Sequence, residues 1–228
     1  MNTENTENKT TQEPLTLGYW KIRGLAHQIR YLLEYLNVPY NEVMYEQGDG
    51  PHFSTDEWKK AIPHIGMQFW NLPYLFDGKL KMSETNAIMR YIVKKFGPEL
   101  EGKTLEDFAI VEQMVGVLRD IKSAISETCY GDGDIEKLKK NVNPEIQALE
   151  DFMKGRKFVA GDYVTYVDFI FYELNELMEF VTNNEHFKTF PNLKVYNQNV
   201  ASLDKIAKYI VSDRYLKIHR FNNKSAKI

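Results

Sequence analysis

The fold of the first part of this chain is decided by residues 17–27, which read LGYWKIRGLAH. A short apolar run ends in Tyr19 and Trp20, crosses a turn bounded by Gly24, and opens into an amphipathic helix. The apolar residues of that helix recur at spacings of three and four, so they share one face; they are Leu25, Ile29, Leu32, Leu33 and Leu36. The pattern predicts a strand over residues 15–20 and a helix over residues 25–36.

The same turn places the phenolic hydroxyl of Tyr19 beside the N-terminus of the predicted helix. Helix N-termini carry free N–H groups and a partial positive charge, so they favour an anion. A phenol beside an anion site indicates a stabilised oxyanion or thiolate.

The bulk composition excludes several classes of protein. The 228 residues allow one large domain or two small ones, with a sizeable core in either case. The formal net charge is −3, which gives no strong field for nucleic acid or for an anionic membrane surface. No apolar run approaches the length of a membrane span. We therefore expect neither a nucleic-acid partner nor a membrane partner.

The single cysteine, Cys129, has no partner for an internal disulfide. No Cys/His cluster has the spacing of a zinc site, so we expect no metal. This use of cysteine favours a reducing, cytoplasmic location.

The N-terminal residues 1–14 read MNTENTENKTTQEP. The segment is polar and lacks an apolar core, so it is neither a secretory signal nor an Arg-rich transit peptide. Its composition predicts a disordered tail.

The first third of the chain alternates strand and helix patterns. Strands over 15–20 and 40–45 flank the helix and form a βαβ unit. A long stretch over residues 46–70 is rich in Gly, Pro, Asp and His and is predicted to be mostly irregular. Asp77-Gly78 then joins the apolar runs 72–76 and 80–82, which is a strong hairpin signal. A helix follows from about Glu84, so the predicted order is β-α-β-α-β-β-α, the second helix being short.

The rest of the chain has helical periodicity. Gly97-Pro98 breaks the preceding helix, and residues 98–103 form a linker. We predict a first domain over 15–97 and an all-helical domain over 104–228. A long helix begins there and ends at the Gly131 turn, with an apolar stripe of Phe108, Val111, Val115, Leu118 and Ile125. The further helices are predicted near 135–154, 166–181, 192–201 and 203–210.

Two helix starts have the pattern of a capping box. Thr104 precedes Asp107 by three residues, and Thr165 precedes Asp168 by the same spacing. Val164 and Phe169 occupy the positions of a hydrophobic staple around the second box. The helix after Thr165 is apolar nearly all round, which predicts a place in the middle of a bundle.

Four segments carry a resemblance to a known family: LGYWKIRGLAHQIR, NLPYLFDG, SETNAI and VTYVDF. The chain resembles the cytosolic glutathione S-transferases, and the mu class most, over about residues 15–222. The resemblance implies an α/β thioredoxin-like domain packed on an all-α domain, working as a homodimer. It implies a detoxifying transferase that joins the thiolate of reduced glutathione to electrophilic, mostly apolar substrates. Glutathione is then a cosubstrate, and no cofactor is permanently bound.

The resemblance also assigns roles to residues. Tyr19 is the catalytic residue, and its hydroxyl donates to the sulfur of glutathione. The backbone of Leu72, before a cis Pro73, pairs with the cysteinyl part, and Glu84 and Thr85 hold the γ-glutamyl group. The other implied glutathione-binding residues are Trp20, Leu25, Trp58, Asn71 and Asp120, the last of which reaches across the dimer. The implied electrophile pocket contains Ile22, Tyr130 and Phe221, and the implied dimer interface contains Phe69 and Arg90.

Two departures from the mu pattern affect binding. An Arg and a Lys that help to hold the glycine carboxylate of glutathione are replaced here by Thr55 and Ile62, and Lys59 or Lys60 could take over. The pocket positions Ser123 and Ser126 are more polar than the usual apolar ones, which leaves the substrate range open.

Two alternatives to the enzyme remain. One is a non-catalytic protein of the same fold that binds glutathione or apolar ligands, or has a structural role. Tyr19 favours the enzyme, whereas Thr55 and Ile62 leave room for this alternative. The other is a thioredoxin-type redox enzyme or a glutathione peroxidase, which would need a reactive cysteine near the first strand–helix turn. No cysteine is there, so this alternative ranks last.

Overall fold

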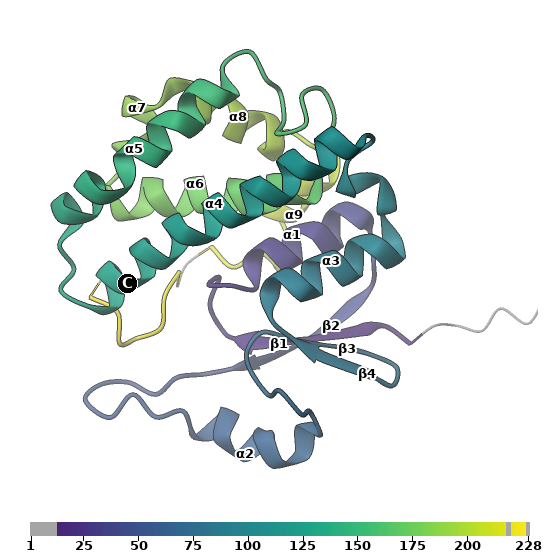
Figure 1. Ribbon diagram of the computed structural model, residues 1–228. Helices are drawn as coiled ribbons and strands as arrows, with labels where there is room; N and C mark the ends of the chain where they lie inside the picture. Colours follow the sequence, from purple (N-terminus) through teal and green to yellow (C-terminus); the bar gives the residue numbers. More distant parts are fainter. Residues whose placement is uncertain (1–12, 218–219, 227–228) are drawn as a thin grey trace, which may run out of the picture.

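A computed structural model describes residues 13–217 and 220–226 (Figure 1). Its four-stranded sheet has the order β2-β1-β3-β4. The strands are β1 (Leu15–Trp20), β2 (Tyr40–Tyr45), β3 (Tyr74–Asp77) and β4 (Leu80–Ser83). The central strand β1 is parallel to β2 and antiparallel to β3, so Gly18 lies between Val43 and Tyr74. The predicted strands 15–20 and 40–45 and the hairpin are confirmed.

Helices cover both faces of the sheet. The helices α1 (His27–Leu36) and α3 (Thr85–Phe96) lie between the sheet and the helical part of the chain, whereas α2 (Asp56–Ile65) lies on the opposite face (Figure 1). The first helix begins two residues later than predicted. Gly24 has a φ of 46°, and the Leu25 amide donates to the Tyr19 hydroxyl instead of to a helical carbonyl.

The short helix predicted between the second and third strands is confirmed by α2, but the prediction of an irregular stretch over 46–70 is wrong for residues 56–65, which form this helix. Asp56 and Glu57 stand in its first turn, where carboxylates complement the helix dipole. Trp58 and Ile65 are its buried residues. Pro63 lies inside the last turn, and this residue made the segment look irregular, because proline usually interrupts a helix.

The remaining helices form the second part of the molecule. They are η1 (Pro98–Glu101), α4 (Leu105–Tyr130), α5 (Ile135–Met153), α6 (Tyr166–Val181), α7 (His186–Thr189), α8 (Pro191–Ala201) and α9 (Asp204–Ile210). Helix α6 contacts α1, α4, α7 and α8, which confirms its predicted place in the middle of the bundle (Figure 1). The short helix α7 was not predicted, since its one turn carries no periodic signal.

Both capping boxes are present. The Asp107 amide donates to the Thr104 hydroxyl at 3.0 Å, and the Thr104 amide donates to the Asp107 carboxylate at 3.2 Å. The buried Asp168 carboxylate accepts from the Thr165 amide at 2.8 Å and from the Tyr196 hydroxyl at 3.0 Å. Burial raises the pKa of Asp168 to about 6, and these hydrogen bonds oppose that shift.

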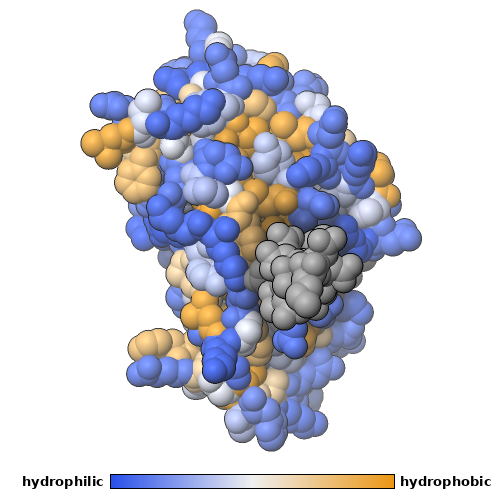
Figure 2. Space-filling model, turned by 90° about the vertical axis from the view of Figure 1, so that its right-hand side faces the viewer, coloured by the Kyte–Doolittle hydropathy of each residue, from blue (hydrophilic) through white to orange (hydrophobic). Residues whose placement is uncertain are grey.

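The apolar stripe of α4 is confirmed at Val111, Val115, Leu118 and Ile125, all buried. Phe108 is the exception, because it is 42% exposed near the start of the helix. None of the helices within residues 13–217 and 220–226 combines the length and the apolar character that crossing a bilayer requires. The face shown in Figure 2 is largely hydrophilic, with apolar side chains in smaller patches. Residues 1–12 of the predicted tail lie outside the described residues.

Candidate functional site

The site starts at the end of β1, where the chain turns toward α1. Tyr19 is buried there, and its hydroxyl oxygen accepts a hydrogen bond from the Leu25 amide at 3.0 Å. Gly24 makes this approach possible, because a Cβ at that position would lie 2.6 Å from the Tyr19 hydroxyl. A phenol has one proton to donate, and the Leu25 bond does not use it. The Tyr19 hydroxyl is therefore arranged to donate to a further acceptor.

Burial raises the pKa of Tyr19 to about 12, although the hydrogen bond from the Leu25 amide opposes the shift. The phenol therefore stays neutral at pH 7. A neutral phenol can donate a hydrogen bond to an anion, whereas a phenolate cannot.

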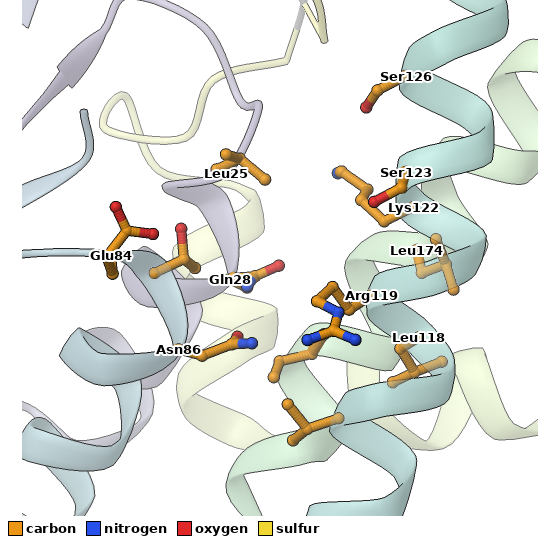
Figure 3. A pocket seen from close by; sticks show the side chains of 13 residues that line it. Leu25, Gln28, Glu84, Asn86, Leu118, Arg119, Lys122, Ser123, Ser126 and Leu174 are labelled. Carbon is orange, nitrogen blue, oxygen red and sulfur yellow. The ribbon is translucent and has the colours of Figure 1, made fainter. Parts of the chain in front are cut away.

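A cavity of about 350 Å³ opens beside this turn, and we call it the interdomain cavity (Figure 3). Helices α1 and α3 form one wall, and α4 and α6 form the other. Its lining residues are Leu25, Gln28, Glu84, Thr85, Asn86, Val115, Leu118, Arg119, Lys122, Ser123, Ser126, Ile170 and Leu174. The structure thus brings together three of the predicted binding residues, Leu25, Glu84 and Thr85.

The loop before β3 positions Glu84. The Leu72–Pro73 peptide bond is cis, as the resemblance implied. The Asn71 side chain donates to the Glu84 carboxylate at 3.0 Å and accepts from the Leu72 amide at 2.9 Å. Glu84 itself has a φ of 75° and a ψ of 112° immediately before α3. Glu84 is the N-cap of α3, so it lies next to the first turn of that helix, whose amides are free.

Predicted residues also meet in a second hydrophobic cluster beneath the sheet. This cluster contains Tyr19, Ile22, Trp58 and Leu72, and Trp20 packs against it. Trp58 anchors α2, since its ring lies 5.3 Å from that of Tyr45 and 6.2 Å from that of Tyr74.

A second cavity, of about 540 Å³, lies between the β2–α2 loop and the C-terminal segment; we call it the loop cavity. It is lined by Lys21, Ile22, Tyr45, Glu46, Gln47, Gly48, Asp49, Ser54, Asp56, Glu57, Asn222 and Asn223. Among the described residues of this lining, Lys21 is the only lysine or arginine, and it pairs with Glu46 at 2.5 Å. Thr55 makes no capping bond at the start of α2, and Ile62 packs against the second hydrophobic cluster.

Of the residues predicted for the electrophile pocket, Tyr130 and Phe221 contact each other, whereas Ile22 belongs to the second hydrophobic cluster; neither Tyr130 nor Phe221 lines the interdomain cavity. Their rings meet edge to face with centroids 5.6 Å apart, and the Tyr130 hydroxyl accepts from the Asn222 amide at 2.9 Å. The Arg220 carbonyl accepts from the Gly24 amide at 3.3 Å, so this C-terminal segment adjoins the turn below Tyr19.

The residues predicted for the dimer lie on the surface of the single chain. Phe69 is 76% exposed, and its neighbour Trp70, which was not predicted, is 54% exposed. Arg90 donates to the Glu112 carboxylate of its own chain at 3.1 Å. Asp120 pairs with the adjacent Arg119 at 3.1 Å and does not line the interdomain cavity of its own chain.

The prediction also missed residues on the cavity-facing side of α4. Arg119 and Lys122 line the interdomain cavity with Ser123 and Ser126. Their spacing of three and four residues was the available signal, because it places them on one face of the helix.

Comparison with known proteins decides the family. Residues 15–94 match the glutathione S-transferase N-terminal domain, and residues 119–213 match the glutathione S-transferase C-terminal domain. The chain belongs to the glutathione S-transferases.

Individual relatives of this glutathione S-transferase agree with the resemblance to the mu class. It is 39% identical to glutathione S-transferase Mu 1 of Bos taurus over 207 residues, which is 89% of this chain and 93% of the relative. It is 38% identical to glutathione S-transferase Mu 4 of Homo sapiens over 206 residues, with the same coverage. The crystal structure of the glutathione S-transferase Blo t 8 superposes with a TM-score of 0.82 at 29% identity, covering 92% of this chain and 98% of its own.

Proposed function

We propose that this glutathione S-transferase joins the thiolate of reduced glutathione to electrophilic, mostly apolar substrates. The observation that carries the proposal is the Tyr19 hydroxyl, which accepts from the Leu25 amide and keeps its own proton for the sulfur. In the reaction the thiol proton passes to solvent, the sulfur bonds to the electrophilic carbon, and a leaving group departs from that carbon or a double bond takes up a proton. Glutathione is a cosubstrate, and no permanent cofactor is needed.

We assign the proposed binding roles to the residues that the resemblance to the mu class names. Glu84 and Thr85 hold the γ-glutamyl group at the start of α3, and Leu72 pairs with the cysteinyl part through its backbone. Trp20, Trp58 and Asn71 line the rest of the peptide. The electrophile lies toward Ile22, Tyr130 and Phe221. The two working units are residues 15–97 and 104–228, joined by residues 98–103.

The working form is a cytoplasmic homodimer that serves detoxification, in which Asp120 of each chain reaches toward the glutathione of the other. Exposed apolar area supports the dimer, since Phe69 and Trp70 stand side by side in the single chain. Arg90 belongs to the same interface.

Turnover tests the enzyme directly. The purified chain should join glutathione to a neutral aryl halide well above the uncatalysed rate. Tight binding of glutathione without such turnover would favour the non-catalytic alternative. The acidic lining of the loop cavity and the residues Thr55 and Ile62 are the observations that keep this alternative open.

Phe69→Ser is expected to release monomers, because it removes the most exposed aromatic side chain of the proposed interface. Sedimentation velocity of the purified variant would measure this. Val211→Ser is the matched control, since Val211 is 78% exposed and lies outside that interface. A Phe69→Ser protein that sediments like the unchanged chain would contradict the interface.

Thr55→Arg is expected to lower the KM for glutathione by about three- to tenfold, because it supplies a cation for the glycine carboxylate at a half-exposed position. Steady-state kinetics at varied glutathione concentration would show this, and added salt should weaken the gain. Thr55→Gln controls for side-chain length. An equal gain in Thr55→Gln would mean that charge is not the cause.

A further inference from the structure

Lys122 occupies an unusual position in the interdomain cavity. It projects from α4, and Figure 3 shows its amine reaching across the cavity toward Leu25, with Ser123 and Ser126 on the same side of the helix. The side chain is half-buried. Within residues 13–217 and 220–226, no hydrogen bond or ion pair joins its Nζ to another residue. Among the described residues, Lys122 is therefore a cation of the cavity wall that no carboxylate contacts directly.

The nearby carboxylates are already engaged by other cations. Glu173 on α6 forms a buried ion pair with Arg23, with one contact at 3.2 Å, and it lies 4.0 Å from Arg220. Glu176 pairs with Arg220 at 3.5 Å. Glu173 and Glu176 thus each have an arginine partner, which leaves Lys122 as a positive charge without a direct carboxylate partner.

The apolar surroundings of Lys122 raise the free energy of its charged form. Leu118, Ile170 and Leu174 are buried residues of the cavity wall. Burial lowers the pKa of Lys122, and the charges of Arg23 and Arg220 lower it further, against the opposing effect of Glu173. A ligand carboxylate at this position would supply the missing counter-ion, and an apolar setting strengthens such a pair.

The cavity also connects Lys122 to the reaction centre. The Leu25 amide donates to the Tyr19 hydroxyl, and the Leu25 side chain lines the cavity, so a sulfur held by Tyr19 would adjoin the mouth of the cavity. The cavity of about 350 Å³ is at the small end of ligand sites, so the electrophile and the γ-glutamyl group would each occupy one side of it. Glu84 lies on the opposite side from Lys122 in Figure 3, bonded to Asn71.

We propose that this transferase selects electrophiles bearing a carboxylate, and that Lys122 receives that carboxylate while Ser123 and Ser126 offer hydroxyl donors beside it. The inference rests on the proposed function and names its substrate class: the reacting carbon lies at the Tyr19 end, toward Ile22, Tyr130 and Phe221, and the carboxylate extends into the interdomain cavity. Arg119 contributes less, because it is exposed and pairs with Asp120.

A matched pair of substrates tests the proposal. The two substrates are 4-chloro-3-nitrobenzoate and 4-chloro-3-nitrobenzamide. In both, the glutathione sulfur bonds to the ring carbon that carries the chlorine, chloride leaves, and the thiol proton goes to solvent. The measured quantity is kcat/KM for each compound divided by its uncatalysed rate constant with glutathione. We expect the unchanged enzyme to favour the benzoate and Lys122→Met to lower the benzoate-to-benzamide ratio about tenfold.

Controls separate charge from folding. Lys122→Arg should keep most of the ratio, and Lys194→Met, at an exposed lysine of α8, should keep all of it. If Lys122→Met fails to fold by circular dichroism, Lys122→Gln takes its place. A ratio in the folded variant equal to that of the unchanged enzyme would overturn the assignment of Lys122.

Failure of the proposed function gives a different result. The unchanged protein would then turn over neither compound above the uncatalysed rate. Calorimetric titration with the benzoate and the benzamide then decides the inference, since a Lys122-dependent preference for the benzoate needs no turnover. Equal affinities for the two compounds would overturn it.

Discussion

Tyr19→Phe is expected to lower kcat by about 10- to 100-fold while leaving the affinity for glutathione within a few-fold. The change removes one hydroxyl from a buried position and keeps the ring that packs in the second hydrophobic cluster. A hydrogen bond to a charged group contributes about 1.5–3 kcal/mol, which corresponds to this loss of rate. The proposed contacts of the glutathione peptide, at Leu72 before β3 and at the start of α3, do not involve this hydroxyl, so we expect its binding to change little.

The energetics of the thiol explain why one hydroxyl has this effect. A thiol with a pKa near 8.5 is only a few per cent ionised at pH 7, and lowering that pKa by about two units requires roughly 3 kcal/mol. In the proposed mechanism, the Tyr19 hydroxyl and the partial positive charge at the start of α1 would together supply about that amount. Since the pKa of Tyr19 is raised to about 12, the phenol donates throughout the physiological range.

Ultraviolet titration of bound glutathione would measure the effect on the sulfur. In Tyr19→Phe, the pH at which the thiolate forms should rise toward that of free glutathione. Tyr91→Phe is the control, because its hydroxyl bonds to Asp77 at 2.7 Å, away from the site. Equal rates and equal thiol pKa values in the unchanged enzyme and Tyr19→Phe would remove Tyr19 from the mechanism.

Glu173→Gln is expected to lower the free energy of unfolding by about 3 kcal/mol or more. Glu173 on α6 and Arg23 in the β1–α1 turn form a buried ion pair that joins the two parts of the chain. The same guanidinium donates hydrogen bonds to the hydroxyls of Tyr31 and Tyr215, at 3.3 and 3.0 Å. Removing the carboxylate charge leaves a buried cation without its counter-ion, which costs more than the pair contributes.

Urea unfolding at one fixed protein concentration would measure this loss, so that any dimer contributes equally. Glu176→Gln is the matched control on the same helix, and it should cost less than about 1 kcal/mol because Glu176 is partly exposed. The double variant Arg23→Met with Glu173→Met should lose less than the two single variants together. Additive losses would contradict a coupled pair.

The sequence predicted the elements whose signals are local. Helix α6 begins after Thr165 and ends at Val181 as predicted, because the capping box and the all-round apolar pattern are contained in the helix itself. Helix α2 was missed as a ten-residue element because Pro63 reads as a break, although it is tolerated in the last turn. Phe108 has the spacing of the buried stripe on α4 but lies near the helix start, where it is exposed.

In the candidate site too, local sequence predicted some residues and not others. Tyr19 was predictable, since the strand, the turn and the helix that place it are consecutive in the sequence. The proposed role of Lys122 was not predictable from the sequence, because it depends on Glu173 being paired with Arg23. These two residues are 150 positions apart in the chain. Which carboxylate pairs with which cation is a property of the packed helices.

The backbone at Glu84 has a consequence for the stability of the whole molecule. A φ of 75° with a ψ of 112° is a conformation that glycine adopts freely and that a residue with a side chain holds only under strain, at a cost of about 1–3 kcal/mol. Selection for thermal robustness alone would put glycine there. A glutamate at this position therefore lowers the stability of the fold relative to a glycine, and the proposed contact of its carboxylate with the γ-glutamyl group would be what offsets that loss.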